Sequence, residues 1–142
     1  MFDKILVVCI GNICRSPTAE FLLRQLLPEK QIESAGLFAM KGQDMDRHAR
    51  RRAENHGYDF PAHMARQFDS QMAREFDLIL VMETEHRNMI AERYPEALAK
   101  TMLLGKWQDN REIPDPYKKS DEVFEHVFKL IDTATKAWAS KL

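Results

Sequence analysis

The sequence predicts an α/β fold with a mostly parallel central sheet, and three observations support this prediction. Residues 5–8 form an apolar run rich in β-branched side chains, which is typical of a strand buried on both faces. Residues 77–82 form a second strongly apolar run of the same kind. Segments with helical spacing lie between and after these runs, and strands that alternate with helices favour a parallel sheet.

The first predicted unit is a strand, a tight loop and a helix. The strand at residues 5–8 is followed by a turn signal at Gly11 and Asn12. Ser16 then has the character of a helix N-cap, with Pro17 at the first helical position. Ligands of parallel sheets bind beyond the carboxyl ends of the strands, so this loop is a candidate site.

The later elements follow from the same signals. A polar loop is expected at residues 110–119, and the apolar side chains after it recur on one face of a terminal helix. The remaining elements are expected as a weak strand at residues 31–34, a polar helix at 46–56, a strand at 77–82, a helix capped by Thr84 and ending near residue 95, and a short strand at 100–104. The face of the terminal helix is expected to comprise Phe124, Val127, Phe128, Ile131 and Trp138.

Composition excludes several classes of protein. The chain has 142 residues, of which 44% are hydrophobic and 30% charged, as in one ordinary globular domain. A net charge of -1 gives no overall attraction to nucleic acid or anionic membranes. The longest apolar stretch, residues 5–10, is too short to span a bilayer, and two cysteines are too few for a secreted disulfide scaffold. We therefore expect a cytoplasmic protein that binds no nucleic acid and does not insert into membranes.

The loop at residues 9–16 carries the chemistry. Backbone amides that lead into a helix N-terminus converge on an anion, and a cysteine in this positive field favours its thiolate. Arg15 can return to the loop and donate two N–H bonds to two phosphate oxygens. Gly11 allows close backbone approach, Asn12 tolerates the left-handed region, and Ser16 can cap the helix and donate to the thiolate of Cys9.

Each of these residues also has an ordinary structural explanation. A lone cysteine that ends a buried strand is usually a small core residue, and a cysteine and an arginine at this spacing are a weak signal alone. Asp115 before a proline is by itself typical of a turn. Arg47 and residues 50–52 form a basic cluster that is expected to be a solvated helix face, with a docking patch for acidic peptides as the alternative. The complete strand, loop and helix pattern favours an oxyanion site.

Residues 8–17 resemble the active-site signature of the low-molecular-weight protein tyrosine phosphatases, with the bacterial branch the most similar. Residues 34–36, 63–67, 76–82 and 115–117 match the family in the same order, so the resemblance covers essentially the whole chain. It implies a single domain at residues 1–142, with a three-layer α/β/α Rossmann-like phosphatase I fold around a four-stranded, mostly parallel sheet.

The resemblance also implies roles for individual residues. Cys9 would be the nucleophile of a phosphocysteine mechanism, Arg15 the phosphate clamp, and Asp115 the general acid and base. The phosphate-binding loop would comprise Ile10, Gly11, Asn12, Ile13, Cys14 and Ser16. Hydrogen bonds from Asn12, Ser16, Ser34 and His63 would support the loop, and Leu37, Phe38 and Tyr117 would line the substrate site. No metal and no cofactor are expected.

Cys14 matches the second loop cysteine of the family. It could trap an oxidised Cys9 as a disulfide and protect it, or it could be a small buried residue. An arsenate reductase of this fold would need further cysteines, and none follows Cys14. Protein arginine phosphatases carry a threonine where this chain has Ile13, and a non-catalytic phosphopeptide-binding module would be expected to lack Cys9, Arg15 or Asp115.

The resemblance implies partners as well. These would be phosphotyrosine-containing proteins, above all a bacterial tyrosine autokinase that controls capsule or exopolysaccharide export. A monomer or a weak dimer is expected.

Overall fold

The structure, a computed structural model, describes residues 2–142. Its central element is a four-stranded sheet. Its strands are β1 (Lys4–Cys9), β2 (Gln31–Gly36), β3 (Leu78–Val81) and β4 (Thr101–Leu103), in the order β2-β1-β3-β4. Every strand pairing is parallel, which confirms the predicted fold class. β2 continues past its predicted end at residue 34 and pairs Gly36 with Cys9.

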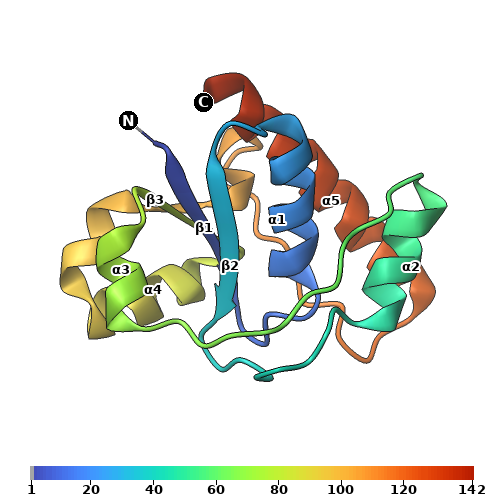
Figure 1. Cartoon of the computed structure of the whole chain (residues 1–142), viewed down its shortest axis with the longest axis horizontal. Coiled ribbons are helices and arrows are strands. Elements are labelled where there is room, and N and C mark those ends of the chain that lie inside the picture. The colour runs from blue at the N-terminus through green and yellow to red at the C-terminus, as the bar shows by residue number, and fades with distance from the viewer. Residues whose placement is uncertain (1) are drawn as a thin grey trace.

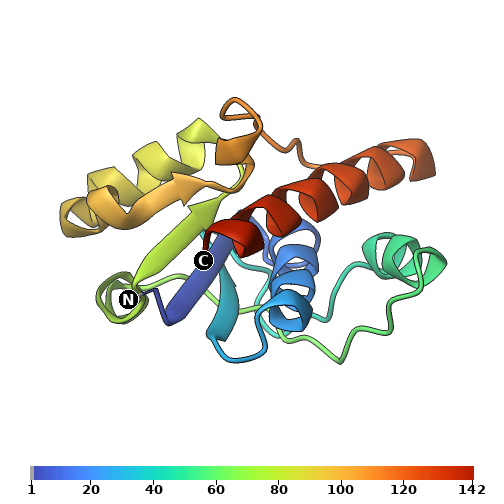
Figure 2. The same ribbon diagram turned by 90° about the horizontal axis from the view of Figure 1, so that it is seen from above.

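Helices cover both faces of the sheet (Figures 1 and 2). One layer comprises α1 (Arg15–Leu26), α2 (Arg47–Asn55) and α5 (Asp121–Lys141), and the other comprises α3 (Ser70–Glu75) and α4 (Thr84–Arg93). Side chains of β1 alternate between these layers, so Val7 packs toward α1 and α5 while Leu6 and Val8 pack toward α3 and α4. Two 3₁₀ helices, η1 (Pro95–Lys100) and η2 (Leu104–Trp107), flank β4.

The terminal helix α5 buries the apolar face that its sequence predicts. Phe124, Val127, Phe128, Ile131 and Trp138 are all at most 5% exposed. Burying one such side chain stabilises a fold by about 1.5–3 kcal/mol, so this face anchors α5 against α1. The Trp138 indole also donates to the carbonyl of Leu104 at 2.9 Å, and this bond satisfies its one polar atom.

Two local predictions were wrong, and one short helix was not predicted. Ser16 does not cap α1, because the helix begins at Arg15, two residues before the predicted start at Pro17, and Cys14 occupies the N-cap position. Thr84 is the first residue of α4 and does not cap it, since Glu83 occupies the N-cap position. The short helix α3 was not predicted, although Asp69 caps it by accepting from the amide of Met72.

The basic cluster on α2 is only partly a solvated face, which corrects the expectation for it. Arg50 donates to the carbonyl of Phe60 at 2.8 Å and to the Asp44 carboxylate at 2.9 Å. The guanidinium of Arg52 lies 4.0 Å from the Glu125 carboxylate on α5. These two arginines therefore hold the loop after α2 and the packing of α2 on α5.

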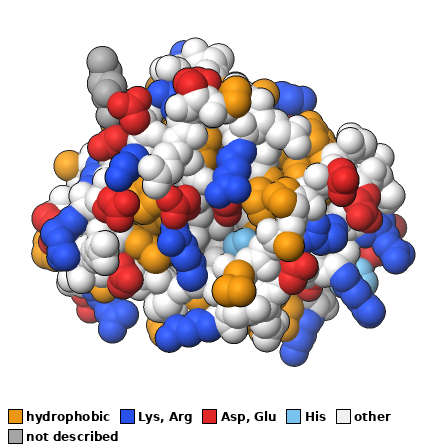
Figure 3. Space-filling view, in the orientation of Figure 1, with side chains coloured by type: hydrophobic (Ala, Val, Ile, Leu, Met, Phe, Trp, Pro, Cys, Tyr) orange, Lys and Arg blue, Asp and Glu red, His pale blue; other side chains and the backbone are white. Residues whose placement is uncertain are grey.

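The surface carries mixed charges. Figure 3 shows acidic and basic side chains interspersed over one face, with no large patch of a single sign. Within residues 2–142, no helix is both long enough and apolar enough to cross a membrane.

Candidate active site

The loop between β1 and α1 lies at the carboxyl edge of the sheet. Cys9 ends β1 and is 3% exposed, and Arg15 begins α1. Asn12 has a φ of 59°, so it takes the left-handed conformation that the sequence predicts for it. Gly11 does not need this conformation, and a Cβ there would meet only ordinary contacts at 3.6 Å.

The glycine that the loop requires is Gly36, at the end of β2. A Cβ on Gly36 would lie 2.4 Å from the carbonyl oxygen of Ile10, a separation that real Cβ atoms do not adopt. The segment after β2 also bonds directly to the loop, since the amides of Leu37 and Phe38 donate to the carbonyls of Cys9 and Ile10 at 2.9 and 3.0 Å. The loop between β1 and α1 therefore rests on backbone that continues from β2.

The side chain of Asn12 is fully buried behind the loop and organises it. Its amide group donates to the hydroxyls of Ser16 at 2.7 Å and Ser34 at 2.9 Å. Its carbonyl oxygen accepts from the backbone amide of Arg66 at 3.0 Å. The main-chain carbonyl of Asn12 lies 2.7 Å from Nε2 of His63. The four residues expected to support the loop thus form one network.

Ser16 contacts the sulfur of Cys9. The two side-chain atoms lie 2.9 Å apart, and Ser16 is completely buried. Because Asn12 donates to the Ser16 oxygen, the Ser16 hydroxyl hydrogen is free to point at the sulfur. A hydroxyl that donates in this direction favours the thiolate of Cys9.

Arg15 is 2% exposed and is held from one side. Its Nη1 donates to the Glu83 carboxylate at 2.6 Å and to the Ile113 carbonyl at 2.8 Å. Its Nη2 lies 3.9 Å from the carboxylate of Asp115. A buried guanidinium fixed through one nitrogen can present its other nitrogen to an oxyanion. Glu83 was not predicted as a site residue. Its position directly after the apolar run of β3 is the sequence signal that places it at this edge of the sheet.

Asp115 lies in the loop before α5. Its side chain is 49% exposed, and Oδ1 accepts from the amide of Tyr117 at 3.1 Å, which closes a small turn around Pro116. Tyr117 is 36% exposed. The loop therefore presents a carboxylate and an aromatic ring toward the loop of β1, although about 100 residues separate them in sequence.

These residues enclose a cavity of about 170 Å³. Leu37, expected in the substrate wall, does not line it, because Leu37 follows the alternation of β2 into the core beside α4. Asn12, Ser16, Ser34 and His63 lie outside its lining, and Met40 was not expected in it. The lining residues are Cys9, Ile10, Gly11, Ile13, Cys14, Arg15, Phe38, Met40, Asp115 and Tyr117.

Two buried side chains near the cavity are held in their neutral forms. Burial raises the pKa of the Cys14 thiol, and the nearby Asp46 carboxylate raises it further. Burial, followed by the charge of Arg15, lowers the pKa of His86 to about 4. His86 lies 3.7 Å from the Glu83 carboxylate, and its Nδ1 atom has no partner within residues 2–142. His86 therefore adds no positive charge at neutral pH.

The arrangement is suited to covalent transfer of an oxyanion group. It combines a cysteine sulfur, a fixed guanidinium and a carboxylate at one cavity. No cluster of three or more potential metal ligands occurs among the described residues 2–142. A thiol, a guanidinium and a carboxyl group are the chemical types that a nucleophile, an anion clamp and a proton donor require.

Comparison with known proteins gives a consistent result. The family model described as "Low molecular weight phosphotyrosine protein phosphatase" matches residues 4–142. The chain is 47% identical to the low molecular weight protein-tyrosine-phosphatase Wzb of Escherichia coli K12, across all of this chain and 97% of that protein. It is 46% identical to Etp of the same strain, across 99% of this chain and 95% of that protein.

Solved structures agree with the sequence relatives. Wzb from Escherichia coli K30 in complex with sulphate superimposes with a TM-score of 0.97 at 52% identity, covering 99% of both chains. Vibrio vulnificus Wzb in complex with benzylphosphonate superimposes with a TM-score of 0.97 at 46% identity over the full length of both chains. The arginine phosphatase YwlE from Geobacillus stearothermophilus is more distant, with a TM-score of 0.90 at 34% identity, covering 96% of this chain and 90% of that one.

Proposed function

Because the chain belongs to the low molecular weight phosphotyrosine protein phosphatase family and is a protein-tyrosine-phosphatase of the bacterial Wzb and Etp type, we propose that it works through a phosphocysteine formed on Cys9. One observation carries this proposal. Cys9 and Arg15 from the loop after β1 line the same cavity as Asp115, which lies about 100 residues later in the sequence. We propose that residues 1–142 act as one domain in the cytoplasm.

In the first step the thiolate of Cys9 attacks phosphorus in line. The sulfur–phosphorus bond forms as the bond from phosphorus to the tyrosyl oxygen breaks, and Asp115 gives its proton to that oxygen. Arg15 and the amides of residues 10–16 hold the three equatorial oxygens, where charge accumulates in the transition state.

In the second step water attacks the same phosphorus and loses a proton to the Asp115 carboxylate. The sulfur–phosphorus bond breaks, and inorganic phosphate and the Cys9 thiolate are released. The contact of 2.9 Å between Ser16 and the sulfur supports this step, since a hydroxyl donor stabilises the departing thiolate.

The walls of the cavity support an aryl phosphate as substrate. Phe38 and Tyr117 place aromatic rings at its mouth, and Ile13 adds an apolar side chain. The complexes of the two Wzb relatives, with sulphate and with benzylphosphonate, hold a tetrahedral oxyanion and an aryl-bearing phosphonate. The oxyanion groups of both ligands are complementary to a guanidinium such as that of Arg15, and the aryl group is complementary to the apolar walls of this cavity.

A substrate panel tests the proposal. Wild-type protein is assayed with matched peptides that carry phosphotyrosine, phosphoserine or phosphoarginine. We expect kcat/KM for phosphotyrosine to exceed the other two by at least about a hundredfold, since only the aryl ester reaches the Cys9 sulfur while stacking on both rings. A preference for phosphoarginine would contradict the tyrosine assignment.

We further propose that the physiological substrate is a tyrosine autokinase that controls capsule or exopolysaccharide export. This proposal rests on the resemblance to bacterial members of the family. Deletion of the gene should raise phosphotyrosine on such a kinase, measured by phosphoproteomics, and the wild-type gene should restore the lower level. An unchanged phosphotyrosine level would contradict it.

A further inference from the structure

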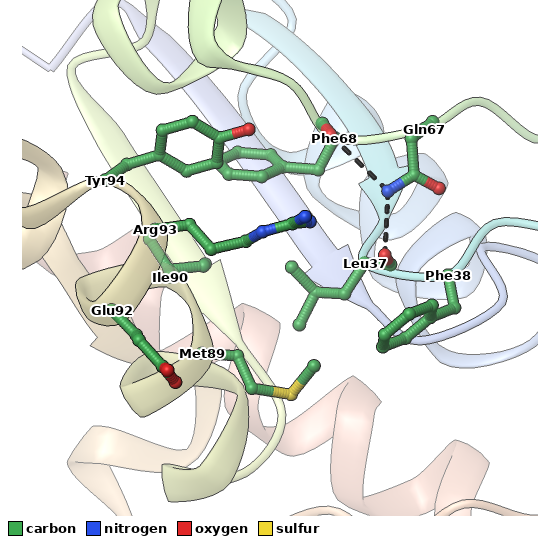
Figure 4. A pocket seen from close by; sticks show the side chains of 9 residues that line it. All are labelled: Leu37, Phe38, Gln67, Phe68, Met89, Ile90, Glu92, Arg93 and Tyr94. Atoms are coloured by element: carbon green, nitrogen blue, oxygen red, sulfur yellow. Dashed lines mark hydrogen bonds between the residues drawn. The ribbon is translucent and has the colours of Figure 1, made fainter.

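A second cavity adjoins the active-site cavity and shares a wall with it. It has a volume of about 200 Å³ and lies between the segment after β2, residues 67–68 and the second half of α4 (Figure 4). Phe38 lines both cavities, so its ring separates them. We call this second cavity the Phe38 groove; its apolar lining consists of Leu37, Phe38, Phe68, Met89, Ile90 and Tyr94.

The shared wall is rigidly held although its ring is exposed. Gln67 donates to the carbonyl of Leu37 at 2.7 Å and accepts from the amide of Ala39 at 2.9 Å, so it holds the backbone on both sides of Phe38. The amide of Phe38 itself donates to the carbonyl of Ile10. The Phe38 side chain is nevertheless 66% exposed. A large exposed aromatic ring on a fixed backbone is typical of a binding surface.

The size and lining of the groove suit one apolar side chain. A cavity of about 150 Å³ accommodates a benzene molecule, so about 200 Å³ can accept one aliphatic or aromatic group. The rings of Phe68 and Tyr94 meet edge to face at 5.5 Å along one side. Met89 lies on the opposite side in Figure 4, pointing toward Leu37, and a methionine adapts to groups of different shape.

The charge at the groove is positive where a ligand would contact it. Figure 4 shows the side chain of Arg93 extending across the groove toward Gln67, whereas the Glu92 carboxylate points away from that guanidinium. Arg93 makes no ion pair or side-chain hydrogen bond within residues 2–142, unlike the partnered Arg15 and Arg66. An unpartnered guanidinium above an apolar floor complements a carboxylate next to an apolar group.

We propose that the Phe38 groove binds the part of the substrate polypeptide that flanks the phosphotyrosine, with an acidic side chain on Arg93 and an apolar side chain against Met89. This inference rests on the proposed function, because the phosphotyrosine must occupy the neighbouring cavity.

The test is a scan of phosphotyrosyl peptides. A glutamate is moved through each position from one to six residues on either side of the phosphotyrosine, in an otherwise neutral peptide. Kinetics are measured for wild type, Arg93→Gln and the matched control Arg51→Gln, since Arg51 is also an exposed helical arginine that lies outside the groove. A small aryl phosphate, which does not reach the groove, reports the chemistry alone.

We expect wild type to favour glutamate at one or two positions by about two- to fivefold in kcat/KM, the range of an exposed ion pair. Arg93→Gln should abolish that preference and Arg51→Gln should keep it, with aryl phosphate turnover equal in all three. Met89→Gln should reduce the preference for leucine over serine beside the favoured glutamate by about three- to tenfold.

Two results would overturn the inference on the groove alone. One is wild-type kinetics that do not depend on the position of the glutamate. The other is a preference that persists in Arg93→Gln, because the carboxylate would then bind elsewhere. Wild-type protein that hydrolyses no phosphotyrosyl peptide at all would overturn the proposed function together with the groove, so the two failures are distinguishable.

Discussion

Replacing Asn12 with alanine should destabilise the protein far more than the same change at another asparagine of similar backbone conformation. Asn12 has a φ of 59° and is completely buried, whereas Asn110 has a φ of 57° and is exposed. Alanine in the left-handed region costs about 1 kcal/mol at either position. Only Asn12→Ala also removes three side-chain hydrogen bonds, to Ser16, Ser34 and the amide of Arg66.

The magnitude follows from these bonds. Each contributes about 0.5–1.5 kcal/mol net, so Asn12→Ala should lower the free energy of unfolding by about 3–5 kcal/mol and Asn110→Ala by about 1 kcal/mol. In a chain of this length, about 1 kcal/mol changes Tm by roughly 2–4 °C. We therefore expect Tm to fall by about 6–20 °C in the first variant and by about 2–4 °C in the second.

The assay pairs urea unfolding with turnover of an aryl phosphate. Asn12→Ala should also lower kcat/KM at least about tenfold at a temperature where it is fully folded, because Ser16 and the loop amides lose their fixed positions. Asn110→Ala should keep its activity. Equal losses of stability in the two variants, or wild-type kcat/KM in Asn12→Ala, would refute the role assigned to the network.

Three further predictions concern single residues. Gly36→Ala places a Cβ against the carbonyl of Ile10 and should lower the free energy of unfolding by about 1–3 kcal/mol; wild-type urea unfolding would contradict this. Because the pKa of His86 is lowered to about 4, protons favour the unfolded chain as pH falls from about 6.5 to about 4. Over this pH range the free energy of unfolding of wild type should fall by up to about 3 kcal/mol more than that of His86→Gln. Parallel plots of unfolding free energy against pH for the two proteins would contradict this prediction. If Cys14 traps oxidised Cys9, Cys14→Ala should recover less activity with thiol after peroxide, and equal recovery would end that hypothesis.

The sheet could be predicted from the sequence because its signals are local. The runs at residues 5–8 and 77–82 are apolar and β-branched, and the strands form there. The helix α3 could not be predicted in the same way, since six residues are too few to form a helix without tertiary contacts.

The site residues that the sequence misplaces or leaves out differ in their physical reasons. The sequence predicts two roles for Ser16, and only the contact with Cys9 forms, because the hydroxyl is buried against Cys9 and Asn12 and away from the amides of the first helical turn. Leu37 lies two residues after Ala35 and therefore faces the same core, which the pattern of β2 could have indicated. The position of Glu83 directly after an apolar strand indicates the site edge, but its pairing with Arg15, 68 residues away, needed the structure.

The central claim is that Cys9 carries the phosphoryl group, and rapid quenching tests it most directly. Wild-type protein is mixed with a radiolabelled aryl phosphate, quenched within milliseconds, and digested for mass spectrometry. We expect phosphate bound covalently to Cys9, a burst of phenol before steady turnover, and neither signal in Cys9→Ser. Turnover without labelled Cys9, or full activity in Cys9→Ser, would contradict it.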